Sequence, residues 1–592
     1  MQPHVDKAFG TGPTVRLRMG VLRRDLDGSK PPTTATAMRP GQLPTALVRR
    51  LARSTRDGDV VGRLGGDEFV VVCIDTVEYG ALEQAPRRAT GTAREPIVVD
   101  GARYRAKAAG PGVVRWAEGQ AIPSRAGPHG SAPSRRYPHP PLHRRVQGHR
   151  MPRLTVLDLR GDRSDPRDRM PRPRVDLAAA REDVEASLAA VRDGGDDALR
   201  QLTARFDGVE LGEHDGLVVP EEVLDESLAR LAPELRAALE RAADQVRWFH
   251  ERARPQDWED ERDGARMGVW HRPVQRAGVY VPGGKAVYPS TVVMTAVPAQ
   301  VAGVEQLVLC TPPTGTGFDG TPDGWPNRTI LAAARLLGVD RVVRVGGAQA
   351  VAAMAYGTAS VPACDLVVGP GNLYVSLAKQ QLAAEGRIGT DGYAGPTEVA
   401  VVADDTADPR VVAADLVAQA EHDELATALL ITPDAELAAA VEVALETEVA
   451  ATRHRARVEA SLQGQGTVAL VDDLDHAVEV AEAFAAEHLE VHTRQARAVA
   501  ERIRYAGTTF IGQPTPVSLG DYAAGPNHTL PTSGTARFAG GLTTSSFLVP
   551  VNFVEYDDAA LRDLADSVHV LATSEDLPAH WRAVEVRLER GR

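Results

Sequence analysis

The 592-residue sequence has only three cysteines, Cys73, Cys310 and Cys364, and they lie far apart. None belongs to a C-x-x-C or a cysteine/histidine ligand spacing, so neither a disulfide framework nor a zinc finger is predicted. The sequence also lacks any run of 18 consecutive apolar residues, and its first residues lack the apolar region of a signal peptide. These absences predict a soluble, cytoplasmic protein without a membrane segment.

Positive charge is in deficit, because the formal net charge is -13 at pH 7. This balance argues against nucleic acids and anionic membranes as general partners, and small molecules are the expected ligands. The 43% of hydrophobic and 25% of charged residues are ordinary for a globular protein. The length has room for about three to four domains.

Acidic residues are absent between positions 119 and 150, where arginine, histidine and proline are frequent. Such proline density excludes a packed element, so we expect residues 103–150 to form a disordered linker. A nucleic-acid-binding or metal-binding tail and translation in another reading frame are the alternatives. Ordinary composition resumes at Met151, which is a candidate translation start.

Residues 1–102 contain one recognisable pattern, a strand-turn-strand sequence around Gly65 and Gly66. It resembles the GGDEF signature of diguanylate cyclases. The resemblance implies a metal-holding role for Glu68 and a product-binding role for Arg56 and Asp59. The Asn-Asp and Gly-His pairs that follow the metal-binding strand in that family are missing here, so we predict a degenerate GGDEF-like fragment without cyclase activity.

From residue 171 to 265 the apolar periodicity is helical. Beyond it, short β-branched runs alternate with helical segments, which predicts an α/β fold with βαβ units and parallel sheets. The predicted strands cover residues 306–310, 341–345, 364–368, 398–402 and 467–471. Glycine-rich turns at 346–347 and 369–371 follow two of them and could bind phosphate through backbone N–H groups, although purely structural turns are an equal alternative.

A predicted helix over 408–423 begins with Asp408 as its N-cap and Pro409 at its first position. Gln419 and His422 then share one face. An amide oxygen and an imidazole nitrogen three residues apart can both bind one zinc ion or a neighbouring transition metal. Two unrelated polar side chains are the alternative.

Short motifs follow one another in a fixed order through the second half of the chain. They occupy residues 276–284, 288–294, 346–350, 369–375, 394–398, 415–422, 486–490, 520–531 and 575–580. This series resembles that of histidinol dehydrogenase, and the resemblance covers about residues 151–592. It implies oxidation of L-histidinol to L-histidine in two NAD-dependent steps with one zinc per site. It also implies a domain-swapped homodimer of incomplete Rossmann-like domains, with helical N-terminal and C-terminal extensions.

The resemblance also implies roles for individual residues. The expected zinc ligands are Gln419, His422, Asp521 and His580. The expected NAD contacts are Tyr280, Gln349 and Asn372. Expected substrate contacts are Thr397, His488, His528 and Glu575, together with the four zinc ligands. Thr397 stands where serine is often found in the family.

Glu487 and His488 are the expected catalytic pair. They lie where a predicted helix gives way to a strand at 489–492, so that both side chains can reach one site. Histidine is suited to accept the alcohol proton near neutral pH, and glutamate can activate the water that hydrates the aldehyde intermediate. His492, on the same strand, is expected to be structural.

Two other functions are considered. One is a paralogous zinc- and NAD-dependent dehydrogenase of another polar alcohol, against which the retained Glu575 and His580 argue. The other is a fusion regulated by cyclic di-GMP bound at Arg56 and Asp59.

Overall fold

The computed structural model describes residues 154–173, 178–212, 216–283, 287–317, 323–339, 341–392 and 395–590, and the backbone of six strands before residue 150. Residue contacts divide the chain into two units, Met1–Arg145 and Val146–Arg592. No helix within the described residues is both long enough and apolar enough to cross a membrane.

The first unit contains a four-stranded sheet in the order β2-β3-β1-β6 and a two-stranded sheet. The two predicted strands are confirmed as the antiparallel pair β2 and β3, in which Gly65 lies opposite Glu68, whereas Gly66 and Asp67 lie outside the described part. Strand β6 pairs with β1 and lies within the stretch predicted as a linker. The residues from 119 to 150 and the side chains of Arg56, Asp59 and Glu68 lie outside the described part. The strands are β1 (Arg16–Arg23), β2 (Val60–Gly65), β3 (Glu68–Asp75), β4 (Ile97–Val99), β5 (Ala102–Tyr104) and β6 (Arg115–Glu118).

The second unit contains a five-stranded parallel sheet in the order β12-β11-β10-β13-β14. Counted along the chain, this is the order 3-2-1-4-5 of a Rossmann sheet without its sixth strand. The predicted parallel βαβ arrangement is therefore confirmed. Its strands are β10 (Arg276–Tyr280), β11 (Gln306–Cys310), β12 (Arg341–Val343), β13 (Leu366–Val368) and β14 (Gly389–Thr390).

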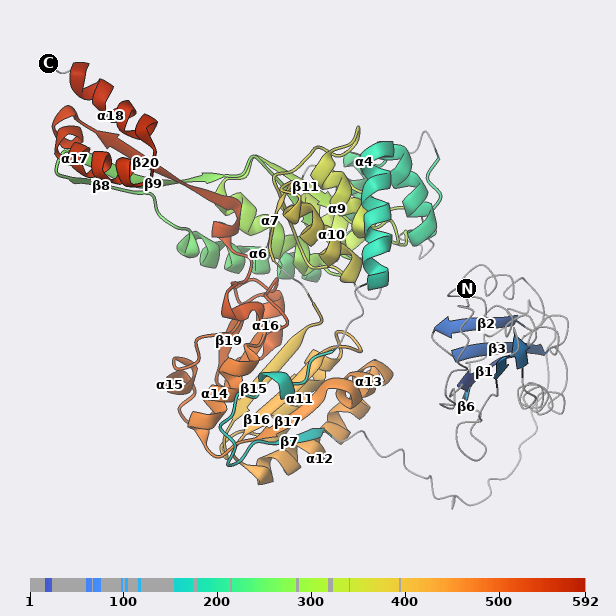
Figure 1. Ribbon diagram of the computed structural model, residues 1–592. Helices are drawn as coiled ribbons and strands as arrows, with labels where there is room; N and C mark the ends of the chain where they lie inside the picture. The colour runs from blue at the N-terminus through green and yellow to red at the C-terminus, as the bar shows by residue number, and fades with distance from the viewer. Residues whose placement is uncertain are drawn as a thin grey trace, which may run out of the picture. The chain divides into compact units, whose positions relative to one another are not determined.

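Helices cover both faces of this sheet (Figure 1). One face packs against α4 (Ala178–Asp207, kinked at Gly195), α9 (Gly347–Tyr356) and α10 (Leu373–Ala384). The other packs against α5 (Glu221–Ala229), α6 (Pro233–Ala253), α7 (Pro289–Ala302) and α8 (Arg328–Leu336). The two glycine-rich turns lead into α9 and α10, as the sequence predicts.

A six-stranded parallel sheet has the order β19-β18-β15-β16-β17-β7. Five of its strands repeat the 3-2-1-4-5 order, and β7 is added beyond β17. The strands are β7 (Thr155–Asp158), β15 (Glu398–Ala403), β16 (Thr427–Thr432), β17 (Gly466–Leu470), β18 (His488–His492) and β19 (Thr508–Ile511). One face packs on α11 (Pro409–Ala420), α12 (Ala435–Ala451) and α13 (Arg455–Gln465), the other on α14 (Leu474–Phe484) and α15 (Ala496–Ala500). Helix α16 (Val517–Tyr522) follows β19.

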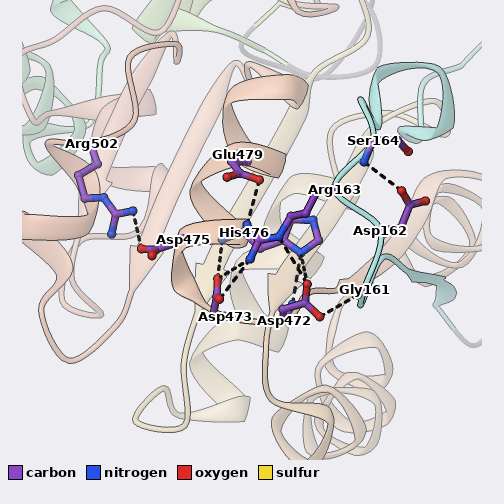
Figure 2. Close-up of polar contacts among 10 residues, drawn as sticks. All are labelled: Gly161, Asp162, Arg163, Ser164, Asp472, Asp473, Asp475, His476, Glu479 and Arg502. Atoms are coloured by element: carbon purple, nitrogen blue, oxygen red, sulfur yellow. Dashed lines mark hydrogen bonds and ion pairs between the residues drawn. The ribbon is translucent and has the colours of Figure 1, made fainter.

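Polar contacts fasten the segment after β7 to the start of α14 (Figure 2). Arg163 forms ion pairs with Asp473 at 3.2 Å and Glu479 at 3.0 Å. The Gly161 N–H donates to Asp472 Oδ1 at 2.8 Å. These partners are more than 300 residues away in sequence. The contacts therefore join the N-terminal segment of the second unit to residues that follow β17 in the same six-stranded sheet.

The predicted helical N-terminal region differs from the structure after Ala253, where α6 ends. There β8 (Trp258–Arg262) and β9 (Ala265–Pro273) form a hairpin, which β20 (Leu548–Tyr556) joins as a third antiparallel strand. The reason is the Asp263-Gly264 turn, in which both residues have positive φ, as in the two-residue turns that favour hairpins. The predicted C-terminal extension is partly helical, because α17 (Asp558–Ser574) and α18 (Pro578–Arg590) follow β20.

Candidate functional site

The candidate catalytic residues gather at the amino edge of the six-stranded sheet. Thr397 directly precedes β15, and His488 begins β18 beside it, since His488 pairs with Val399. Helix α11 runs back along the sheet, so its C-terminal end returns Gln419 to the same edge. The Asp408 N-cap predicted from the sequence is confirmed, because its carboxylate accepts from the Arg410 N–H, but the helix ends at Ala420 rather than at residue 423.

A chain of hydrogen bonds joins three of these residues. Gln419 Nε2 donates to Thr397 Oγ1 at 2.6 Å, and that hydroxyl donates to Glu487 Oε2 at 2.5 Å. The Glu398 N–H also donates to Glu487 Oε2, at 2.9 Å. The amide of Gln419 is thereby oriented so that its oxygen, Oε1, points away from Thr397. This oxygen is buried without a hydrogen-bond partner, which makes it a candidate cation ligand.

Two further candidate ligands lie beside this chain. His422 Nδ1 lies 3.1 Å from the Ala418 carbonyl oxygen, which can only accept, so the ring proton is on Nδ1. Nε2 is then left with its lone pair and lies 3.8 Å from Asp521 Oδ2. Asp521 is carried by α16. An amide oxygen, an imidazole nitrogen and a carboxylate form a donor set that suits zinc.

His488 is buried and faces the same carboxylate. Its Nδ1 lies 3.3 Å from the Glu398 carbonyl oxygen, which places the proton there and leaves Nε2 as an acceptor 3.9 Å from Asp521 Oδ1. Burial lowers the pKa of His488 and raises that of Glu487 to about 7. A neutral imidazole and a carboxyl that titrates near neutrality are both suited to proton transfer.

The carboxyl edge of the five-stranded sheet reaches this site through α7. Thr291 Oγ1, near the start of α7, lies 3.3 Å from His528 Nε2, and His528 Nδ1 lies 3.0 Å from the Asp521 carbonyl oxygen. Asn527 donates to the Met294 carbonyl oxygen in the middle of α7. The structure therefore brings His528 to the other candidate residues.

The candidate NAD contacts lie at the carboxyl edge of the five-stranded sheet. Tyr280 ends β10, and its buried hydroxyl accepts from the Gly347 N–H at 3.1 Å. Gln349 is buried in the first turn of α9. Asn372 caps α10, since its Oδ1 accepts from the Val375 N–H at 3.2 Å. Burial raises the pKa of Tyr280 to about 12, so its hydroxyl stays protonated.

Glu575 and His580 are not brought to these residues within one chain. Both are exposed, Glu575 at the C-terminal end of α17 and His580 on α18. Among the described elements, α18 packs on α17, where Trp581 lies against His569 with ring centroids 4.4 Å apart. Without them, printed contacts still link Gln419, Thr397 and Glu487 to one another, and His422, His488 and His528 to Asp521.

A second cluster of polar residues lies between α11 and β18, and it was not predicted from the sequence. His492 Nε2 is 3.9 Å from both Asp415 Oδ2 and Glu490 Oε2, and all three residues are buried. Burial raises the pKa of Asp415 to about 6 and that of Glu490 well above its usual range. Glu490 Oε1 accepts from the Val517 N–H at 2.9 Å, so the cluster holds the start of the helix that carries Asp521.

Spacing in the sequence could have identified this cluster. His488, Glu490 and His492 are spaced two residues apart, and this spacing places their side chains on the same face of a strand. Asp415 stands four residues before Gln419, at the spacing of one helix face. The structural role of His492 stays a prediction.

The second unit is similar to known proteins over most of its length. The family model described as histidinol dehydrogenase matches residues 170–588. Histidinol dehydrogenase from Thermobifida fusca is 48% identical over 439 residues, covering 74% of this chain and 98% of that protein. The Mycobacterium bovis enzyme is 48% identical over 449 residues, covering 74% and 99%. The crystal structure of histidinol dehydrogenase from Elizabethkingia anophelis superposes with a TM-score of 0.70 at 30% identity, covering 75% of this chain and 99% of that chain. The chain belongs to the histidinol dehydrogenase family.

Proposed function

We propose that this protein oxidises L-histidinol to L-histidine through L-histidinal, with one zinc ion per site and NAD as the acceptor of both hydrides. The observation that carries the proposal is the bonded chain from Gln419 through Thr397 to Glu487. This chain leaves Gln419 Oε1 without a hydrogen-bond partner. In the same region His422 Nε2 faces Asp521 Oδ2 at 3.8 Å. Membership of the family supplies the substrate.

Gln419, His422 and Asp521 would hold the zinc from this chain. When bound, zinc supplies a template that binds the imidazole and amino groups of the substrate and fixes its hydroxymethyl group. Thr397 would touch the substrate and hold both neighbours, Gln419 and Glu487, in place. Its hydroxyl serves the two hydrogen bonds described above, and serine could form the same bonds.

Proton transfers are assigned to His488 and Glu487. His488 Nε2 accepts the alcohol proton in the first oxidation, because Nδ1 already donates to the Glu398 carbonyl. Glu487 takes a proton from the water that adds to the aldehyde, since only a hydrated aldehyde can release a second hydride. Thr397 and Glu398 hold Glu487 by one oxygen, Oε2, so its direction is fixed before substrate enters. NAD is assigned to Tyr280, Gln349 and Asn372.

We propose that the fourth zinc ligand, His580, and Glu575 come from a second copy of the chain in a domain-swapped homodimer. Their exposure in one chain supports this. Around them the C-terminal module, comprising β8, β9, β20, α17 and α18, exposes large apolar side chains, and such surfaces in proteins mark interaction sites. They include Trp258, Val549, Val551, Val554, Val570 and Leu571.

Mixing two inactive variants tests the shared site. His422→Ala and His580→Ala should each be inactive alone. After unfolding and refolding together, random pairing makes half of the dimers mixed, and each mixed dimer holds one intact site if the ligands come from different chains. Activity should then return to about a quarter of the wild-type value. Ligands from the same chain would restore none.

Growth of a histidine auxotroph on histidinol tests the function. We expect residues 151–592 alone to support growth, because the family match begins at residue 170, and we propose that residues 1–150 are dispensable. The same fragment carrying His422→Ala should not support growth. If only the full chain supported growth, the N-terminal segment would be a working part. If neither did while both accumulated in the cell, another polar alcohol would be the substrate.

A further inference from the structure

A buried ion pair joins α10 to the segment that follows β14 of the five-stranded sheet. Lys379, on α10, has no exposed surface, and the side chain of Asp391, just after β14, is 2% exposed. Lys379 Nζ lies 2.5 Å from Asp391 Oδ1. Lysine is almost never fully buried unless it is paired, and a buried ion pair brings little net stability over apolar side chains of similar volume. Stability alone therefore does not account for this pair.

Both side chains also bind one glycine. The Gly369 N–H donates to Asp391 Oδ2 at 2.7 Å, and the Gly369 carbonyl accepts from Lys379 Nζ at 2.9 Å. The closed ring of contacts fixes the two peptide groups that flank Gly369. Its φ is +114°, and a Cβ added there would lie 2.1 Å from the Tyr280 carbonyl oxygen. Only glycine fits so close to that backbone.

The position of this glycine connects the pair to a ligand site. Gly369 directly follows β13 and lies beside the end of β10, because Val368 pairs with Val279. In sheets of this order, dinucleotides bind at the carboxyl edge where the strand order reverses. The turn then leads to Asn372, and it packs against Tyr280, whose hydroxyl binds the Gly347 N–H. The ion pair thus supports the backbone between two of the candidate NAD contacts.

We propose that Lys379 and Asp391 are positioning residues for the dinucleotide cofactor, and that they hold the turn over residues 369–372 in the shape that binds it. The proposal rests on the NAD part of the proposed function. Neither side chain touches the cofactor, since both lie beneath the turn. They act through the peptide groups of Gly369.

Binding of NADH to the zinc-loaded protein, followed by the fluorescence of the dinucleotide, tests the proposal without turnover. The double variant Lys379→Met/Asp391→Asn removes both charges together, so that neither is left buried alone. We expect its Kd for NADH to rise roughly 10- to 100-fold, as when supporting partners are removed at other preorganised sites. In turnover, KM for NAD should rise more than kcat falls, with zinc content unchanged.

Two further variants keep the result decisive. Lys379→Gln retains N–H donors for the Gly369 carbonyl and should bind NADH with an intermediate Kd, which also covers the case of a double variant that does not fold. Arg504→Met removes an exposed 2.8 Å ion pair with Glu482 near the six-stranded sheet and should leave the Kd unchanged. Wild-type affinity in a double variant or in Lys379→Gln, with only a lower melting temperature, would overturn the proposal. A wild-type protein that does not bind NADH would instead overturn the NAD assignment.

Discussion

Replacement of His422 by alanine is expected to remove both the bound metal and turnover. His422 Nε2 is one of three atoms from this chain that face the proposed zinc position, and its Nδ1 is held by the Ala418 carbonyl. Loss of an outer partner of a metal ligand costs 10- to 100-fold in affinity or activity, so loss of a ligand itself should cost more than about 100-fold. Metal content by atomic emission and NADH formation from histidinol measure the two effects.

His454, near a helix that packs on the six-stranded sheet, provides the control. His454 precedes α13, and its Nε2 accepts from Arg453 Nε at 3.0 Å. His454→Ala should retain zinc and activity. If the His422→Ala protein held one zinc per chain and turned over normally, the ligand assignment would be wrong.

The second large effect separates the two oxidations. Glu487→Gln keeps the shape of the side chain and an oxygen that can accept from Thr397 and the Glu398 N–H, but it removes the base. A general base contributes roughly 10²- to 10⁴-fold. We therefore expect a loss of this size in histidinal oxidation, with a smaller loss in the first hydride transfer from histidinol, each followed as NADH in a single turnover.

His488→Ala should impair both half-reactions, because both release a hydroxyl proton. The variant removes Nε2, the acceptor that faces Asp521. A Glu487→Gln enzyme that oxidises histidinal at the normal rate would refute the division of roles. Equal losses with both substrates in Glu487→Gln would mean that the pair acts as one unit, to which individual roles cannot be assigned.

Local patterns predicted the elements that carry the site. The β-branched runs predicted the central strands, since a strand buried on both faces must be apolar throughout. The Asp408-Pro409 start predicted α11, and helical spacing predicted that Gln419 and His422 lie on one side near its end, although His422 follows the last residue of the helix. The hairpin of β8 and β9 was missed because β8 is mostly charged and exposed along its whole length, so no apolar alternation marked the first of its two strands.

Other features depend on contacts between distant segments. The Gln419 amide is oriented by Thr397, which lies 22 residues earlier, and Glu487 is held from 90 residues away. Neither contact follows from a local pattern. Glu575 and His580 differ in the opposite way. Sequence motifs predicted them to be site residues, but the fold of one chain leaves them exposed.

The yield of NADH from a limiting amount of L-histidinol shows whether one active site carries out both oxidations. With excess NAD and zinc-loaded protein, we expect two molecules of NADH for each molecule of histidinol consumed, with L-histidine as the product. One molecule of NADH with accumulation of the aldehyde, or none at all, would contradict this expectation.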